Sequence, residues 1–328
     1  MAQTIILIAL ALTFGYLNGF SDSSNIVATM ISSRAMSPRM ALGLIAVTET
    51  ISPFIFGVAV AHSIGQGIVA PQAISPAVVL AALASAILWG LFTWFFGIPS
   101  SASHALVGGF LGAVASGPGI GSIDLSGIAR VLIALFAAPF LGLVVGFLVT
   151  RLTYFLARRA TPRINWFFRQ AQFVTGISLG LSYGANDSQK TMGMIALALV
   201  ATHVTEQFEV PLWVIGISAL AIALGTTTGS WRLIRTLGGR FYKIRPLNGF
   251  CSQLATATIV LSSGLLGGPV STTQVISSAI LGVGSAERIN KVRWGVAQNI
   301  AVAWVLTIPA TALLSALVYE VVIHFGLI

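Results

Sequence analysis

Charged residues are scarce in this sequence. Asp, Glu, Lys and Arg together make up 8% of its 328 residues, whereas a soluble domain carries about 25%. So few charges could not cover the surface of an ordinary cytosolic globule of this size, and a disordered chain would also need more of them. With 56% hydrophobic residues and a mean hydropathy of +0.94, the composition indicates a polytopic membrane protein.

Cysteine is nearly absent as well. Cys251 is the single cysteine, which excludes an internal disulfide and a cysteine-rich metal site. The N-terminal apolar run has no basic residues in front of it, so we interpret it as a first membrane span and not as a cleaved signal. No His-rich metal motif or paired His–Asp arrangement is present. The sequence therefore predicts no catalytic residues and no cofactor, and it disfavours an intramembrane enzyme.

Long apolar runs make up most of the chain. A helix needs about 20 apolar residues to cross the hydrocarbon of a bilayer. The candidate segments are 4–33, 40–63, 73–96, 97–116, 126–150, 168–201, 210–231, 248–266, 268–285 and 293–325. Strands of a membrane barrel are excluded because the runs do not alternate with a period of two. We therefore expect an all-α polytopic membrane protein with about ten membrane segments.

Lysine and arginine are confined to every second loop between these segments. Of the 17 basic residues, only Arg130 and Lys190 lie elsewhere. Because basic loops face the cytoplasm, the pattern predicts a multi-pass protein of the inner or plasma membrane, with both termini outside. The bilayer then accounts for the formal charge of +9, and no nucleic-acid partner is expected.

Two motifs occur twice. Residues 19–25 (GFSDSSN) match 184–190 (GANDSQK), and residues 97–104 (GIPSSASH) match 267–274 (GGPVSTTQ), at nearly the same offset. Two similar halves of five segments each would have opposite topology, which is typical of transporters with broken or re-entrant helices and a binding site at the midplane. We predict a first repeat over 1–150, a basic cytoplasmic linker over 151–167 and a second repeat over 168–328.

Each copy of the first motif places an aspartate inside an apolar segment. Asp22 and Asp187 would each cost several kcal/mol there unless paired, hydrated or protonated, so a functional role is the default interpretation. Gly19 and Gly184 could break their helices and free backbone carbonyls. A carboxylate beside free carbonyls suits a small cation or a proton. The alternative is a structural hydrogen bond or a buried pair.

Each copy of the second motif combines a proline with hydroxyl residues. We expect Pro99 and Pro269 in the first turn of a helix, where the missing N–H costs nothing. The hydroxyls that follow are those of Ser100, Ser101, Ser103, Ser271, Thr272 and Thr273. Two helix N-termini that converge near the membrane centre would form an oxyanion site. The alternative is helix capping and helix packing.

Three further ionisable residues lie inside the segments. Lys190 shares a helix face with Asp187, and it could neutralise that carboxylate, contact an anion or occupy a cation position with its own ammonium. Asn25 is its neutral counterpart in the first half. Glu49 could carry a coupling proton or act as a protonated hydrogen-bonding residue. His104 is a candidate for proton coupling, although a lone histidine is more often structural.

At these motifs the sequence resembles the inorganic phosphate transporter family, which carries a Gly-x-Asn-Asp motif and a Pro-x-Ser motif in each half. Residues 228–238 and 292–310 are also similar to the family's second half. The resemblance implies a symporter that moves phosphate inward with a proton or sodium ion. By motif match it implies phosphate contacts for Ser101, Ser103, Asn186, Gln189, Lys190, Ser271, Thr272 and Thr273. The match also implies coupling-cation roles for Asp22, Asn25 and Asp187, where Na⁺ is expected. Glu49 and His104 are further candidates for the coupling cation because of their place in the sequence.

The sequence departs from the family pattern in several places. Ser21 stands in place of an asparagine, Ala102 in place of a hydroxyl residue, Gln253 in place of a glutamate and Gln274 in place of a histidine. Because two proton-handling groups are lost, sulfate, which relatives carry, remains an alternative substrate. An ion channel is a further alternative, although paired broken helices favour alternating access. A homodimer is implied by the resemblance alone.

Overall fold

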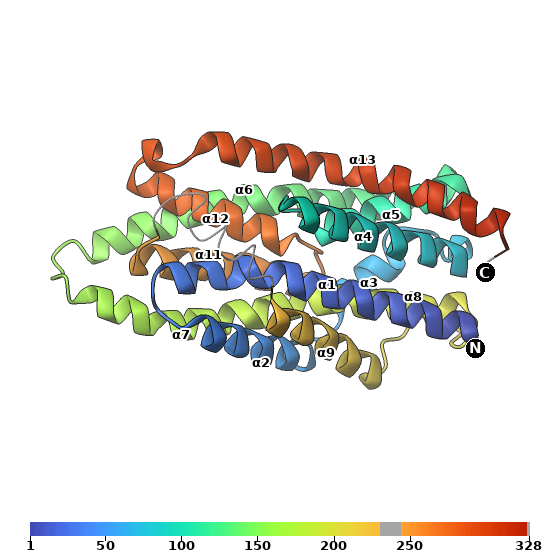
Figure 1. Ribbon diagram of the computed structural model, residues 1–328, viewed down its shortest axis with the longest axis horizontal. Coiled ribbons are helices and arrows are strands. Elements are labelled where there is room, and N and C mark those ends of the chain that lie inside the picture. The colour runs from blue at the N-terminus through green and yellow to red at the C-terminus, as the bar shows by residue number, and fades with distance from the viewer. Residues whose placement is uncertain (230–243, 327–328) are drawn as a thin grey trace.

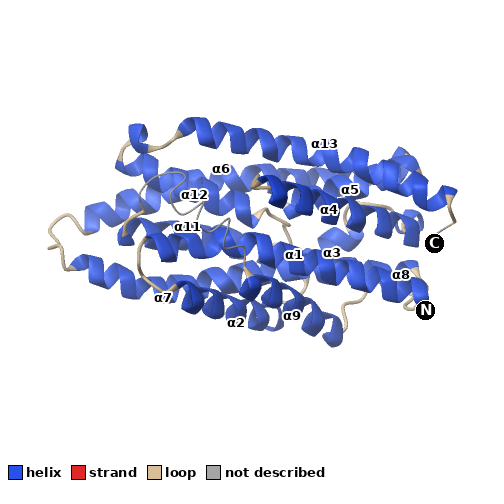
Figure 2. Ribbon diagram, viewed as in Figure 1, coloured by secondary structure: helices blue, strands red, loops and turns tan. Residues whose placement is uncertain are grey.

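The computed structural model describes residues 1–229 and 244–326, and within these ranges the protein consists of helices and loops without a β-strand (Figure 2). The prediction of an all-α protein is therefore confirmed. The long helices are α1 (Ala2–Ser32), α2 (Pro38–Phe56), α4 (Pro76–Phe96), α6 (Leu125–Leu156), α7 (Ile164–Tyr183), α11 (Pro246–Leu265) and α13 (Trp294–His324). The shorter ones are α3 (Ala59–Gln66), α5 (Ala102–Ser116), α8 (Gln189–Ala201), α9 (Leu212–Thr228), α12 (Thr272–Glu287) and the π-helical turn η3 (Gly184–Ser188).

Five of the described helices are long and apolar enough to cross a membrane, judged by length and composition. They are α1, α2, α4, α6 and the part of α13 from Ala297 to His324. Their outward faces carry large apolar side chains, such as Phe95, Ile133 and Leu313, which are each more than 60% exposed. A surface of this kind is unfavourable in water and is typical of contact with lipid.

Local sequence signals explain where several helices begin. Ser37 and Ser75 each accept a hydrogen bond from a backbone N–H in the first turn, and each is followed by a proline at the first helical position. Asp124 caps α6 in the same way, through the N–H groups of Ser126 and Gly127. These residues satisfy N–H groups that have no partner within the helix.

The helices pack along one long axis (Figure 1). Both termini lie at one end of this bundle, and the connection between α6 and α7 lies at the other end. The predicted basic linker over 151–167 is partly helical, because α6 continues to Leu156 and α7 begins at Ile164. Most of the next predicted basic loop (Arg232, Arg235, Arg240 and Lys243) lies outside the described residues, as does most of the family-like stretch 228–238.

Two helical hairpins extend into the bundle from opposite ends (Figure 1). One consists of α4 and α5, the other of α11 and α12, and their tips meet in the middle. The returning helix of each hairpin packs closely on a long outer helix through glycine. A Cβ atom on Gly112 of α5 would lie 1.9 Å from the carbonyl oxygen of Ala312, and one on Gly282 of α12 would lie 2.1 Å from that of Leu143.

Several predicted segments are subdivided in the structure. Segment 168–201 consists of α7, η3 and α8, and segment 40–63 is divided at Gly57 into α2 and α3. The expected break at Gly19 is wrong, because α1 runs through this residue without interruption. Gly19 instead allows close packing, since a Cβ there would lie 2.2 Å from the carbonyl oxygen of Ile222. The break in the second half takes the form of a π-helical turn, a feature often found at functional sites.

Candidate functional site

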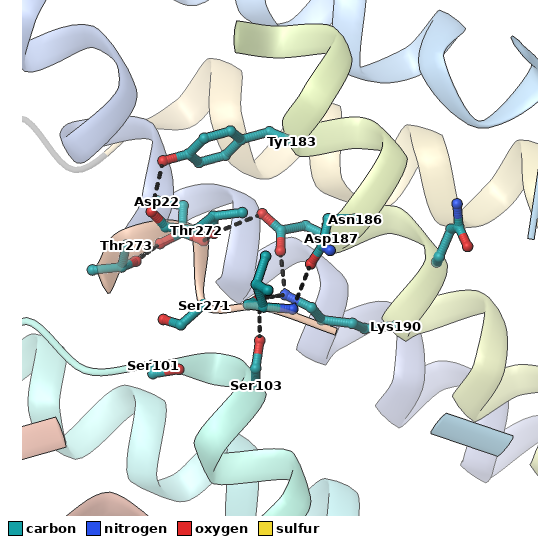
Figure 3. A network of polar contacts seen from close by, with 12 residues as sticks. Asp22, Ser101, Ser103, Tyr183, Asn186, Asp187, Lys190, Ser271, Thr272 and Thr273 are labelled. Carbon is teal, nitrogen blue, oxygen red and sulfur yellow. Dashed lines mark hydrogen bonds and ion pairs between the residues drawn. The ribbon is translucent and has the colours of Figure 1, made fainter. Parts of the chain in front are cut away.

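The two aspartates of the repeated motif meet in the centre of the bundle (Figure 3). Asp22 lies on α1 and Asp187 on the π-helical turn, and their exposed fractions are 7% and 3%. Both carboxylates contact one hydroxyl group: Thr272 Oγ1 lies 3.1 Å from Asp22 Oδ2 and 2.9 Å from Asp187 Oδ2. Since one hydroxyl has a single proton, it can donate to only one carboxylate at a time.

The hydroxyls that face these carboxylates come from the N-terminus of α12. Ser271 is the N-cap, and its side chain accepts the backbone N–H of Gln274. The first two helical residues are Thr272 and Thr273, and the Thr273 hydroxyl hydrogen-bonds Asp22 Oδ1. The positive end of the helix dipole thus lies beside two carboxylates, an arrangement that stabilises negative charge.

The prolines of the second motif lie outside the helices that they were expected to begin. Pro99 and Pro269 each lie two residues before the N-cap, which is Ser101 for α5 and Ser271 for α12. The expectation that they occupy the first turn is therefore wrong. The serine N-caps define the helix starts because their side chains satisfy a first-turn N–H, and the two copies of the motif have them at equivalent positions.

Lys190 forms a buried ion pair with Asp187. Its Nζ contacts Asp187 Oδ1 and also donates a 3.0 Å hydrogen bond to the carbonyl oxygen of Val270. The lysine is 1% exposed. A buried ion pair must offset the desolvation of both charges, so removal of one partner alone leaves a costly unpaired charge.

Asn186 and Tyr183 fix the chain that leads into α12. Asn186 Nδ2 donates to the carbonyl of Gly268 at 3.1 Å, and its Oδ1 accepts the N–H of Val270 at 3.4 Å. The Tyr183 hydroxyl donates to the carbonyl of Thr272 at 3.1 Å. Tyr183 was not predicted from the sequence, although it directly precedes Gly184 of the first motif and is a polar aromatic residue inside an apolar segment.

The hydroxyls of the α5 motif serve different partners. Ser103 Oγ donates to the carbonyl of Val270 at 2.9 Å, which joins the tips of the two hairpins. Ser101 Oγ lies 2.8 Å from His104 Nδ1 and accepts the backbone N–H of His104 at 3.2 Å. His104 is fully buried, and its ring nitrogens lie 3.4 Å and 3.5 Å from Gln274 Nε2. His104 and Gln274, which occupy equivalent motif positions, therefore face one another.

A cavity of about 60 Å³ lies beside this cluster, between α1, α4 and the tip of the first hairpin. One water needs roughly 10–15 Å³ on the same scale, so the cavity suits small ions. Asp22, Asn25, Ser101 and Thr273 line it, as does Asn18. The Nδ2 atom of Asn18 is buried and has no hydrogen-bond partner among the described residues. Asn18 was also missed from the sequence.

Gln189 and Glu49, two predicted site residues, form their hydrogen bonds with partners other than Asp22 and Asp187. Gln189 Oε1 accepts the N–H of Val60 at 2.7 Å and that of Ala61 at 3.3 Å, at the start of α3, while its Nε2 donates to the carbonyl of Ala185. It therefore fixes the position of α3. Glu49 on α2 is 2% exposed, and its Oε2 accepts a 2.7 Å hydrogen bond from Thr226 on α9.

Comparison with known proteins gives consistent similarities. The model of the phosphate transporter family matches residues 18–315. A Rhizobium meliloti (strain 1021) protein named "Probable low-affinity inorganic phosphate transporter" is 44% identical over 315 residues, which cover 95% of this chain and 94% of that protein. A Bacillus subtilis (strain 168) protein with the same name is 39% identical over 320 residues, 96% of each chain.

One solved structure is similar over the whole fold. It is named "The sodium-dependent phosphate transporter", and it aligns with a TM-score of 0.88 over 99% of this chain and all of that chain. The sequence identity is 24%, so this likeness concerns the fold.

Proposed function

The chain belongs to the phosphate transporter family, and from this premise we propose that it takes up inorganic phosphate together with a cation, by alternating access. Its relatives are transporters, and the chain is not an enzyme. The observation that carries the proposal is the meeting of both copies of both motifs at one point. There, Thr272 lies between the carboxylates of Asp22 and Asp187, next to a small cavity.

We infer an inverted repeat with about ten membrane segments. Three equivalences support it: Asp22 with Asp187, the N-cap Ser101 with Ser271, and Gly112 with Gly282. In each half the returning helix of the hairpin packs on a long outer helix, α5 on α13 and α12 on α6. An inverted repeat of this kind permits one half to move against the other around a fixed central site.

The membrane orientation follows from the basic residues. The α1–α2 and α6–α7 connections, whose sequences are basic, lie towards one end of the bundle, and both termini lie at the other end (Figure 1). Under the positive-inside rule the basic end faces the cytoplasm. We therefore propose an inner or plasma membrane protein with both termini outside.

Phosphate is proposed to bind in the cavity beside the tip of the first hairpin. The hydroxyl of Ser101 and the N-terminus of α5 can supply donors to oxyanion oxygens, and the Asn18 side chain lines the same cavity. The hydroxyl protons of Thr272 and Thr273 are directed at carboxylates. These two threonines would therefore act as anion ligands only after the carboxylates bind a cation or a proton.

The coupling cation is proposed to bind at Asp22. The Asp22 carboxylate, the Thr273 hydroxyl and the Asn25 side chain line the same cavity, and oxygen atoms of this kind suit a small hard cation. Neutralisation of this carboxylate lowers the repulsion that an incoming phosphate would meet. Protons or sodium ions would each satisfy this requirement, and Glu49 and His104 remain candidates for carrying a proton.

Uptake of labelled phosphate into proteoliposomes tests the proposal. We expect saturable uptake that depends on a sodium or proton gradient, because transport requires a cation at Asp22. Separate sodium and proton gradients identify the coupling ion, and competition with sulfate tests the alternative substrate. Phosphate flux that neither saturates nor responds to a cation gradient would instead indicate a channel.

A further inference from the structure

The two halves of the site differ at equivalent positions. The offset that pairs Asp22 with Asp187 also pairs Asn25 with Lys190 and Asn18 with Tyr183. In the second half the larger residues make contacts: Lys190 reaches Asp187 and Val270, and Tyr183 reaches Thr272. The smaller asparagines of the first half both line the cavity.

The Lys190 ammonium occupies a cation-binding environment. It lies between a carboxylate oxygen of Asp187 and the carbonyl oxygen of Val270, which it contacts at 3.0 Å. A carboxylate and a backbone carbonyl in the loop before a helix are the ligands that a small hard cation would take. The ammonium is fully enclosed, so its position is held by the protein and not by solvent.

The position in the first half that corresponds to the Lys190 ammonium lies in the cavity beside Asp22. Ser100 is equivalent to Val270, and Ser100, Asp22 and Asn25 all line the cavity. The cavity therefore lies where Lys190 would be if the first half had a lysine in place of Asn25. The neutral amide of Asn25, whose Nδ2 contacts Thr273 Oγ1 at 3.3 Å, leaves room for a mobile ion.

Asp187 and Asp22 also differ in their charged partners. Among the described residues the ion pairs are Lys190–Asp187 and Arg245–Glu287. Within the described part of the chain, Asp22 hydrogen-bonds only to the hydroxyl groups of Thr272 and Thr273. Because a buried carboxylate without a positive partner is costly, Asp22 requires a cation that the chain does not supply, whereas Asp187 does not.

We propose that Lys190 is a tethered cation, which permanently fills the second-half cation position and leaves one mobile monovalent-cation site, at Asp22. This inference rests on the proposed cation–phosphate symport. It implies that each transport cycle moves one cation fewer than a protein with free cation sites in both halves. Lys190 is then a specificity-determining residue for coupling, and it is not a ligand that travels with phosphate.

The variant Lys190→Asn tests this inference, because it gives the second half the residue that the first half has. The ratio of cation to phosphate is measured in proteoliposomes from the membrane potential at which net phosphate flux stops. We expect the ratio to rise by one in Lys190→Asn, and we expect uptake at low cation concentration to fall at least tenfold. Lys190→Arg, which retains the positive charge, should transport more slowly at the wild-type ratio. Arg130→Gln, which removes an exposed positive charge elsewhere, is the matched control.

Two results would overturn the inference. One is an unchanged ratio in a Lys190→Asn protein that still transports. The other is loss of phosphate binding at every cation concentration in a variant whose thermal unfolding is unchanged, since this would make Lys190 a phosphate ligand. If Lys190→Asn does not fold, the wild-type protein provides the test. We expect phosphate binding by the wild-type protein to depend on cation concentration with a Hill coefficient of one. A Hill coefficient of two would contradict the inference. Failure of the proposed function itself is distinguishable, because wild-type uptake would then respond to no cation gradient.

Discussion

Ser103 on α5 donates a 2.9 Å hydrogen bond to the carbonyl oxygen of Val270, which directly precedes the N-cap of α12. This bond joins the tips of the two hairpins at the centre of the bundle. The same carbonyl also accepts a hydrogen bond from Lys190. The segment before α12 therefore connects the first hairpin to the buried ion pair. A movement of one hairpin against the other would change the contacts of the carboxylates.

Asp22→Asn and Asp187→Asn should differ in effect. Asp22→Asn removes the carboxylate proposed to bind the mobile cation, so we expect cation-dependent phosphate uptake to fall at least 100-fold while the protein remains folded. Asp187→Asn leaves the Lys190 ammonium buried without its partner, which costs roughly 3–5 kcal/mol for a buried pair. Thermal unfolding in detergent should therefore show a clear loss of stability for Asp187→Asn only. Equal unfolding temperatures for both variants would contradict this difference.

The hydroxyl of Thr272 should matter more than its methyl group. Thr272→Val keeps the shape of the side chain and removes the hydroxyl that lies between Asp22 and Asp187. We expect phosphate uptake to fall at least tenfold, because a buried acceptor that loses its donor costs about 1–3 kcal/mol. Thr272→Ser retains the hydroxyl and is the matched control. Comparable losses in both variants would assign the role to packing.

Substitutions at the two equivalent N-caps, Ser101 and Ser271, should distinguish helix capping from phosphate binding. Ser101→Ala and Ser271→Ala each remove an N-cap, at a cost of about 1 kcal/mol. Only Ser101 lines the cavity, so only Ser101→Ala should raise the KM for phosphate, by roughly three- to tenfold. Initial uptake rates across a range of phosphate concentrations provide the measurement. An unchanged KM in Ser101→Ala would place the anion elsewhere.

Packing of α5 on α13 should tolerate no side chain at Gly112. A Cβ on this residue would lie 1.9 Å from the carbonyl oxygen of Ala312, so Gly112→Ala must push the two helices apart. We expect a loss of stability of roughly 1–3 kcal/mol, as for other overpacked sites, and a lower unfolding temperature. Gly43→Ala is the control, because nothing lies within 4 Å of a Cβ at that exposed helical position.

The stability of the first turn of α6 should decrease at acid pH. The N–H of Gly127 and the hydroxyl and N–H of Ser126 hold the pKa of Asp124 below its ordinary value of 3.8. A carboxyl with a lowered pKa stabilises the folded state above its ordinary pKa, and this contribution is lost as the pH falls through the lowered value. The protection of residues 124–128 against hydrogen exchange, taken relative to the intrinsic exchange rate, should therefore fall below about pH 4. The same segment in Asp124→Asn, whose side chain does not titrate, should show a smaller dependence on pH.

Much of the fold could be predicted because the apolar segments are long and charges are few. The helical class followed from the length of the apolar runs, and the pairing of Asp22 with Asp187 followed from the repeated motif. The sequence could not show that Gly19 packs against Ile222 without a break in α1, since a glycine permits either a bend or a close contact. It also could not show where α5 and α12 begin, because proline and serine are both compatible with a helix start.

The partners of each polar side chain were also beyond sequence reasoning. Gln189 belongs to the same motif as Lys190, yet it fixes α3 through Val60 and Ala61. Asn18 and Tyr183 gave no motif signal of their own, and their roles emerge from what surrounds them. A hydrogen bond depends on distances of a few tenths of an ångström, which residue spacing does not specify across helices far apart in the chain.

The sequence by itself indicated a membrane protein, which charged residues lie inside its apolar segments, and that two motifs each occur twice. These properties depend on composition and spacing, and the cost of a buried charge makes each exception informative. The sequence also showed that Lys190 has a neutral counterpart in Asn25, but only the tertiary structure decided which partners the two aspartates have. Asp187 has a lysine within contact distance, while Asp22 faces a cavity, and that difference depends on which side chains fill the space between packed helices.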